Sequence, residues 1–152
     1  MTRTKAREIA VGLIYALSVG EQSADELLES FFEGEHYATL ADEDELYDSR
    51  PDKKQSAYIS ELVTSAAEHL PELDGYIQKY SVGWKPERIS RTALAALRCA
   101  LCEILYMSDA PTAAAINECV ELAKGYEEPD TVAFINGVLG AFMRGENRET
   151  EE

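Results

Sequence analysis

The chain has 152 residues, of which 45% are hydrophobic and 28% charged, and its formal net charge is −15. This length and composition are typical of one globular domain with its own core, and they exclude disorder of the whole chain. No apolar run reaches the roughly 20 residues that a membrane span needs. Three cysteines without disulfide spacing favour a cytoplasmic protein.

The negative charge is distributed unevenly along the chain. The first twenty residues have a net charge of +2, contributed by Arg3, Lys5 and Arg7 against one acid. Residues 21–52 hold twelve acids and one basic residue, whereas residues 79–98 are locally positive. Local charge decides where a phosphate can bind, so this acidic chain keeps two basic segments that suit an anionic partner.

Hydrophobic residues recur at steps of three and four along most of the chain, which predicts helices and no strands. The first helix should span about 4–19, with its core face centred near Leu13. Val11 and Tyr15 then fall almost opposite that face. They are expected to form a partner-binding patch, unless a second layer of helices covers that side as well.

The next helix is predicted from a capping box at Ser23 to about Phe32. Residues 33–52 are acidic and turn-rich, and we expect them to form a solvated insert, since they lack the glycine and the ligand spacing of a calcium loop. Five more helices are predicted. The first begins after Asp52, the second spans about 71–80 and the third spans 90–107. The fourth runs from Pro111 to about Gly125–Tyr126, and the fifth runs from Asp130, its N-cap, to about Arg144.

These elements predict an all-α fold of about seven helices in two small antiparallel bundles. The helix over 90–107 is apolar nearly all round and should lie in the middle. Residues 81–86 break the helical pattern and mark a seam. The predicted units are a single domain 1–152, its subdomains about 1–82 and 83–146, the insert 33–52 and a frayed tail 145–152.

No catalytic constellation is found in the sequence. His36 and His69 have no cysteine or serine partner at a readable spacing and are interpreted as surface histidines. Cys99, Cys102 and Cys119 are interpreted as core residues; a redox or metal role for the C-x-x-C pair is the alternative. We therefore expect no enzyme activity, no metal and no cofactor.

Several sequence strings are specific when they are taken together. They are Ala6–Tyr15, Trp84–Ile89, Ala96–Arg98, Glu103–Leu105, Asp109–Pro111, Ala115–Lys124 and Asp130–Gly140. Together they resemble the NusB family of bacterial transcription antitermination factors, over nearly the whole chain except the acidic insert. The resemblance implies two three-helix bundles side by side and a protein that is not an enzyme.

The same resemblance implies a set of partners. Family members bind the boxA element of ribosomal RNA leader transcripts, as a heterodimer with the small-subunit ribosomal protein NusE. That complex joins the elongating RNA polymerase together with other Nus factors. Some members self-associate, so a homodimer is also expected to be possible.

The resemblance also assigns roles to residues by position. It implies RNA contacts from Arg3, Lys5, Arg7, Tyr80, Asp130 and Phe134, and a NusE contact from Tyr15, beside Val11 on the predicted patch. Basic residues beside exposed aromatic rings suit single-stranded RNA, because cations hold phosphates and rings stack on bases.

Three departures from the family pattern shape these expectations. The N-terminal basic run is thin, and Ala93 and Leu94 stand where the family often has an acidic and then a basic residue. The net charge of −15 is also more acidic than expected of an RNA binder. We therefore expect weak binding to RNA alone and a strong dependence on the partner. The alternative is a helical protein–protein adaptor that has lost RNA binding. The RNA-binding portion of an RNA methyltransferase is disfavoured, since no catalytic domain follows residue 152.

Overall fold

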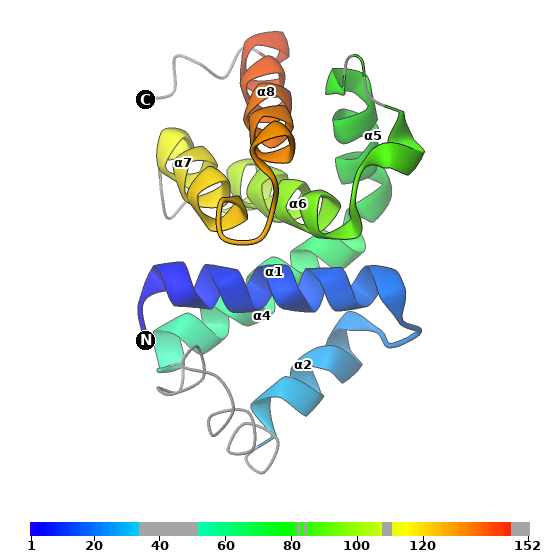
Figure 1. Cartoon of the computed structure of the whole chain (residues 1–152). Coiled ribbons are helices and arrows are strands. Elements are labelled where there is room, and N and C mark those ends of the chain that lie inside the picture. The colour runs from blue at the N-terminus through cyan, green and yellow to red at the C-terminus, as the bar shows by residue number, and fades with distance from the viewer. Residues whose placement is uncertain (34–51, 82, 84, 108–110, 147–152) are drawn as a thin grey trace.

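The computed structural model describes residues 1–33, 52–81, 83, 85–107 and 111–146. Within these ranges the chain forms seven α-helices, one 3-10 turn and no strand, so the predicted all-α fold is confirmed (Figure 1). In chain order they are α1 (Arg3–Val19), α2 (Ala24–Phe32), α4 (Lys53–Glu68), α5 (Leu70–Tyr80), η2 (Pro86–Arg88), α6 (Arg91–Tyr106), α7 (Thr112–Ala123) and α8 (Pro129–Gly145). Most of the acidic insert, the tail beyond residue 146, His36 and Trp84 lie outside the described residues.

Side-chain caps explain where several helices begin. The predicted capping box is present at α2, where the Ser23 hydroxyl accepts from the Glu26 backbone N–H and the Glu26 carboxylate accepts from that of Ser23. Asp52 accepts from the backbone N–H of Gln55 at 2.8 Å and starts α4. Ser90 caps α6 in the same way.

Helix α8 begins earlier than the sequence predicted. Pro129 is its first residue and Glu128 is its N-cap, without a side-chain capping bond. The predicted N-cap role of Asp130 is therefore wrong. Proline suits the first position of a helix, because its fixed φ is already helical and it has no N–H to satisfy. Asp130 is the second helical residue, and its side chain is exposed.

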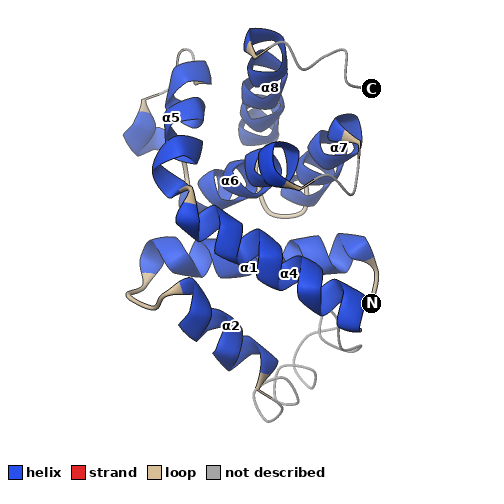
Figure 2. Ribbon diagram, turned by 180° about the vertical axis from the view of Figure 1, so that it is seen from behind, coloured by secondary structure: helices blue, strands red, loops and turns tan. Residues whose placement is uncertain are grey.

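Helix α6 is the centre of the structure. It packs against α1 and α4 on one side, and against α5, α7 and α8 on the other. Helix α2 packs on both α1 and α4, and Figure 2 shows it outside that pair from behind. Every residue of α6 from Ala95 to Glu103 is buried, which confirms its predicted central position.

Helix α5 packs against α6 and α8, although it precedes the predicted seam at 81–86. Its buried residues Leu73 and Ile77 belong to the same hydrophobic cluster as the rest of the core. The division into subdomains at about residue 82 stays a prediction.

Both sides of α1 are covered. Val11 is only 9% exposed, and Tyr15 is half-buried and packs against the core. The prediction that these two residues form an exposed patch is wrong, because α1 lies between α4 and α6 while α2 also packs on it. Leu13, the predicted centre of the core face, is only half-buried.

Arg7 is buried in the interior, with 4% exposure. Its Nε and Nη2 donate to the two carboxylate oxygens of Glu103 at 2.9 and 2.6 Å, and its Nη1 donates to Glu118 at 3.0 Å. Burial alone would lower the pKa of Arg7, but the hydrogen bonds and the charge of Glu103 outweigh it and raise the pKa. This charged group therefore ties α1 to α6 and α7.

The three cysteines are buried and free, which confirms their interpretation as core residues. The thiol of Cys119 donates to the carbonyl of Ala96 at 3.3 Å. Burial raises the pKa of Cys102 to about 11 and that of Cys119 to about 12, and it raises the pKa of Cys99 well above its usual range. Each thiol is therefore held in its unreactive, protonated form.

Replacing Glu103 by glutamine should lower the free energy of unfolding by about 3–5 kcal/mol, because Arg7 then stays buried without its bidentate partner. Urea unfolding followed by circular dichroism measures the loss. Glu121→Gln is the matched control: its ion pair with Lys124 is exposed, with both side chains 57% accessible. That control should lose less than about 1 kcal/mol, and equal losses in the two variants would contradict the structural role of the buried pair.

The folded protein should react very slowly with Ellman's reagent at pH 8. With a pKa of about 11 for Cys102 and about 12 for Cys119, the thiolate fraction at that pH is about one in a thousand or less. In denaturing urea all three thiols should react quickly. A cysteine that reacts as fast in the folded protein as in urea would show that the core is open at that position.

Candidate functional site

The N-terminal ends of α1 and α4 meet at one corner of the molecule. The Arg3 guanidinium donates from Nε to the Gln55 side-chain oxygen at 2.9 Å, and it lies 3.8 Å from the centroid of the Tyr58 ring. Arg3 is in the first turn of α1, and Gln55 is in the first turn of α4. This contact therefore places two helix starts side by side (Figure 1).

Four basic residues belong to these two helix starts. They are Arg3, Lys5, Lys53 and Lys54, and we call them the basic corner. The three lysines are exposed, while Arg3 is half-buried. The first backbone N–H groups of both helices add positive potential at the same place. The corner is therefore locally positive in a protein of strongly negative charge.

Sequence reasoning found only part of the basic corner. Lys53 and Lys54 follow the acidic insert directly and lie outside the two segments that the sequence marks as basic. The packing of α4 on α1, with the bond between Arg3 and Gln55, brings them to the start of α1. An RNA contact from Arg7, implied by the resemblance, needs an accessible side chain. That expectation is wrong, because Glu103 and Glu118 hold the Arg7 guanidinium inside the protein.

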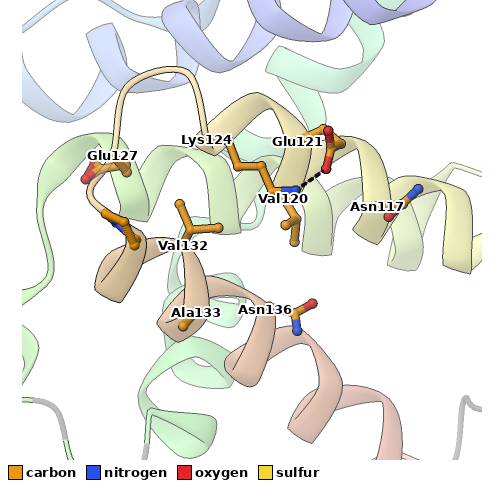
Figure 3. A pocket seen from close by; sticks show the side chains of 9 residues that line it. Asn117, Val120, Glu121, Lys124, Glu127, Val132, Ala133 and Asn136 are labelled. Carbon is orange, nitrogen blue, oxygen red and sulfur yellow. Dashed lines mark hydrogen bonds and ion pairs between the residues drawn. The ribbon is translucent and has the colours of Figure 1, made fainter.

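A groove of about 510 Å³ opens between α7 and α8 (Figure 3). Its lining residues are Asn117, Val120, Glu121, Lys124, Glu127, Pro129, Val132, Ala133 and Asn136. Figure 3 shows Asn117 and Asn136 at one end and Glu127 at the other. Both asparagines are exposed, and neither carboxamide has a hydrogen-bond partner among the described residues. The groove thus offers free donors and acceptors beside an apolar floor.

Helix α7, which forms one wall of the groove, contacts the first turns of α1. The Thr4 hydroxyl donates to Glu118 at 2.7 Å, and Arg7 reaches the same carboxylate oxygen. Glu118 follows Asn117 along α7, so one residue links α1 to the asparagine end of the groove. The acidic groups of the groove have partners of their own: Glu121 pairs with Lys124 at 2.6 Å, and Glu127 accepts from the hydroxyl of Ser90 at 2.9 Å.

The structure does not bring all the predicted RNA-binding residues together. Tyr80 lies beside the C-terminal end of α8, where its hydroxyl donates to Glu146. Asp130 and Phe134 belong to the N-terminal end of the same helix. At 1.5 Å per residue the two ends are about 24 Å apart. Phe134 is 8% exposed and lies in the core, so its ring is not free to stack on a base.

His69 was expected to lie on the surface, but it is half-buried at the junction of α4 and α5. Its ring stacks on Tyr106 with 4.0 Å between centroids, and its Nδ1 lies 2.8 Å from the Ser65 carbonyl oxygen. Across the described part of the chain, no three histidine, cysteine, aspartate or glutamate side chains are grouped to hold a metal ion. No helix in that part is both long and apolar enough to span a membrane.

Comparisons with known proteins agree with this architecture. The model of the NusB family matches residues 4–144. The transcription antitermination protein NusB of Thermoanaerobacter sp. strain X514 is 38% identical over 152 residues, which cover 100% of this chain and 97% of that protein. The protein of the same description from Acetivibrio thermocellus is also 38% identical, over 159 residues that cover 99% and 100% of the two chains.

A solved structure of the antitermination factors NusB and NusE in complex with double-stranded RNA has the same fold. It superposes with a TM-score of 0.73 over 94% of this chain and 96% of that chain, at 23% identity. The sequence relatives and the family match together cover almost every helix described above. This chain therefore belongs to the NusB family of transcription antitermination proteins.

Proposed function

We propose that this protein promotes antitermination by binding RNA through the basic corner and the α7–α8 groove, together with the partner protein NusE. A related NusB was solved with NusE and RNA, which supports both partners for this chain. The RNA is proposed to be the single-stranded boxA element of ribosomal leader transcripts. The complex then joins the elongating RNA polymerase with other Nus factors, in the cytoplasm, and acts by binding rather than by catalysis.

The observation that carries this proposal is the contact between Arg3 and Gln55. It gathers three exposed lysines and two helix N-termini at one place. Phosphate groups bind well at such a place, because lysine ammonium groups and the first N–H groups of a helix both attract anions. The rest of the sequence is acidic on average, so the corner is a region where an RNA backbone meets little repulsion.

The groove between α7 and α8 is the proposed place for an unstacked base. Side-chain carboxamides offer a donor and an acceptor together, the combination that pairs with base edges. Asn117 and Asn136 present such groups from opposite helices, and the apolar side chains of Val120 and Val132 lie farther along the groove, toward Glu127. A volume of about 510 Å³ falls within the range of small-ligand sites.

Arg7 is proposed to act as a positioning residue. It holds the first turns of α1 against α6 and α7, and thereby fixes Lys5 relative to the groove. Asp130 is exposed at the start of α8, where its carboxylate stabilises the helix and repels a phosphate. We therefore propose a moderate affinity for RNA alone, which NusE binding raises.

The second candidate function is an adaptor that binds NusE but not RNA. The burial of Arg7 favours it, because one of the three basic residues expected to contact RNA is unavailable. Lys53 and Lys54 compensate for that loss in the proposal above. The two functions differ in one measurable property: only the RNA-binding protein should prefer boxA to a scrambled RNA in the presence of NusE.

Fluorescence anisotropy of a short boxA RNA, with and without NusE and at several salt concentrations, tests the phosphate contacts. The double variant K53Q/K54Q should bind boxA and scrambled RNA more weakly by the same factor. Its dependence of log K on log salt should be shallower by about 1.4, since each phosphate contact on a single strand contributes about 0.7.

The control for that variant is K85Q/R88Q, which removes the same charge from exposed residues in and beside η2. It should keep the affinity and the salt dependence of the natural sequence. A larger loss in K85Q/R88Q than in K53Q/K54Q would place the RNA elsewhere. Equal binding of boxA and scrambled RNA by the NusE complex would support the adaptor instead.

Replacing both Asn117 and Asn136 by alanine tests the proposed base site. The double variant should lose selectivity for boxA over scrambled RNA by about 5- to 150-fold, because a bidentate contact to a base is worth about 1–3 kcal/mol. Its salt dependence should not change, since no phosphate contact is removed. N117D/N136D keeps the size of both side chains but removes their donors, and it should lose at least as much. Unchanged selectivity in both variants would exclude the groove from base recognition.

A further inference from the structure

Three polar groups meet between the end of α5 and the end of α8. The Lys79 ammonium lies 3.1 Å from Oε2 of Glu146, and the Tyr80 hydroxyl donates to the same oxygen. One carboxylate oxygen is therefore held by two donors from consecutive residues. Glu146 follows the last residue of α8, Gly145. Lys79 begins the locally positive segment 79–98, whereas Glu146 was not a candidate from the sequence.

The surrounding packing fixes this arrangement. The Tyr80 ring packs edge-on against Phe142, with 6.0 Å between the ring centroids. A Cβ at Gly145 would lie 2.2 Å from the Tyr80 hydroxyl oxygen, so only glycine lets the ring reach the end of α8 at this position. The Tyr80 hydroxyl is therefore held in position to donate to the Glu146 carboxylate, or to another acceptor that replaces it.

The donor set suits an anionic oxygen in general. An ammonium and a phenol O–H converge on it, and neither donor can be satisfied by a cation. Hydrogen bonds from these groups to Glu146 raise the pKa of both Lys79 and Tyr80, as expected for donors that hold an anion. A phosphodiester oxygen presents the same charge and the same acceptor geometry as a carboxylate oxygen.

We propose that Glu146 is an internal competitor for RNA: in the free protein it occupies a phosphodiester site that Lys79 forms together with Tyr80, the residue for which the resemblance implied an RNA contact. This inference rests on the proposed function, because RNA is the ligand that supplies the phosphodiester. The site lies about 24 Å from the start of α8, and about 15 Å along that helix from Asn136 in the groove. It therefore contacts a different part of the RNA from the base site.

The competitor is suited to displacement. Lys79 is 61% exposed and Glu146 23% exposed, so water and salt weaken their ion pair. A site that is open for a fraction of the time binds its ligand more weakly by that same fraction. If Glu146 occupied the site for about 90% of the time, its removal would strengthen the phosphate contact about tenfold. The acidic residue thus sets the affinity of the site.

The first test is RNA binding by Glu146→Ala, measured by anisotropy with NusE present. The variant should bind boxA RNA about 3- to 10-fold more tightly than the natural sequence. Its salt dependence should be steeper by about 0.7, because one more phosphate contact forms. Glu72→Ala is the matched control: Glu72 is exposed in the first turn of the same helix α5, and its removal changes the net charge equally.

A second variant separates competition from a general charge effect. In E146A/K79Q the ammonium is also missing, so the gain in affinity should disappear. An equal gain in E146A and E72A, or an unchanged gain in E146A/K79Q, would overturn the proposal. Thermal unfolding of each variant checks that the fold is kept.

The third test does not depend on RNA. Inorganic phosphate is titrated into the natural protein and into E146A while the backbone amide NMR signals of Lys79 and Tyr80 are followed. E146A should show saturable shifts at lower phosphate concentrations than the natural protein. If these shifts appear but no protein binds RNA even with NusE, the anion site stands and the proposed function fails. If boxA binds selectively but E146A shows no phosphate shifts, the proposed function stands and this inference fails.

Discussion

The buried contact between Arg7 and Glu103 is the interaction on which the arrangement of the helices around α1 depends. A guanidinium with 4% exposure must have its charge and its N–H groups satisfied inside the protein, and Glu103 does this with both oxygens while Glu118 takes a third hydrogen bond. These two acids come from α6 and α7, which follow α1 by about a hundred residues. One side chain therefore fixes the first turns of α1 against the second half of the chain.

The same constraint explains how a strongly acidic protein keeps a positive surface. Several carboxylates near the proposed RNA path are already hydrogen-bonded within the protein: Glu118 by Thr4 and Arg7, and Glu127 by Ser90. The exposed lysines at the starts of α1 and α4 form no ion pair with an acid in the described part of the chain. The fold thus separates basic from acidic side chains on the surface, so the net charge of −15 does not predict the charge of any one face of the molecule.

Features that depend on residues close together in the sequence could be predicted from it, whereas features that depend on contacts between distant segments could not. Helix starts at Ser23 and Ser90 depend on neighbours three residues away, and such local signals were sufficient for the helices and for the central place of α6. The face of α1 was predicted wrongly, because a helical wheel assumes one buried side, whereas α4 and α6 cover two. Family resemblance supplied the partners and several positions.

The site was harder to predict than the helices, because its contacts join distant segments. Nothing near Arg7 in the sequence reveals that its acids lie 96 and 111 positions away. The position of Lys53 and Lys54 likewise depends on a bond between residues 3 and 55. One wall of the groove could be predicted from the sequence, because the spacing of Asn117, Val120, Glu121 and Lys124 places them on one face of α7. The residues of α8 that face them are identified only by the three-dimensional structure.

The packing of α5 against α6 and α8 has a consequence for synthesis on the ribosome. Leu73 and Ile77 are buried by helices that are made later, and α8 begins about fifty residues after α5 ends. At 5–20 residues per second that interval lasts about 3–10 s. During it the nascent chain carries an amphipathic helix whose apolar face lacks α8, one of its two main final partners. Completion of the fold therefore waits for the last helix to emerge, and the early half of the chain is the part most exposed to chaperones and to aggregation while it is being made.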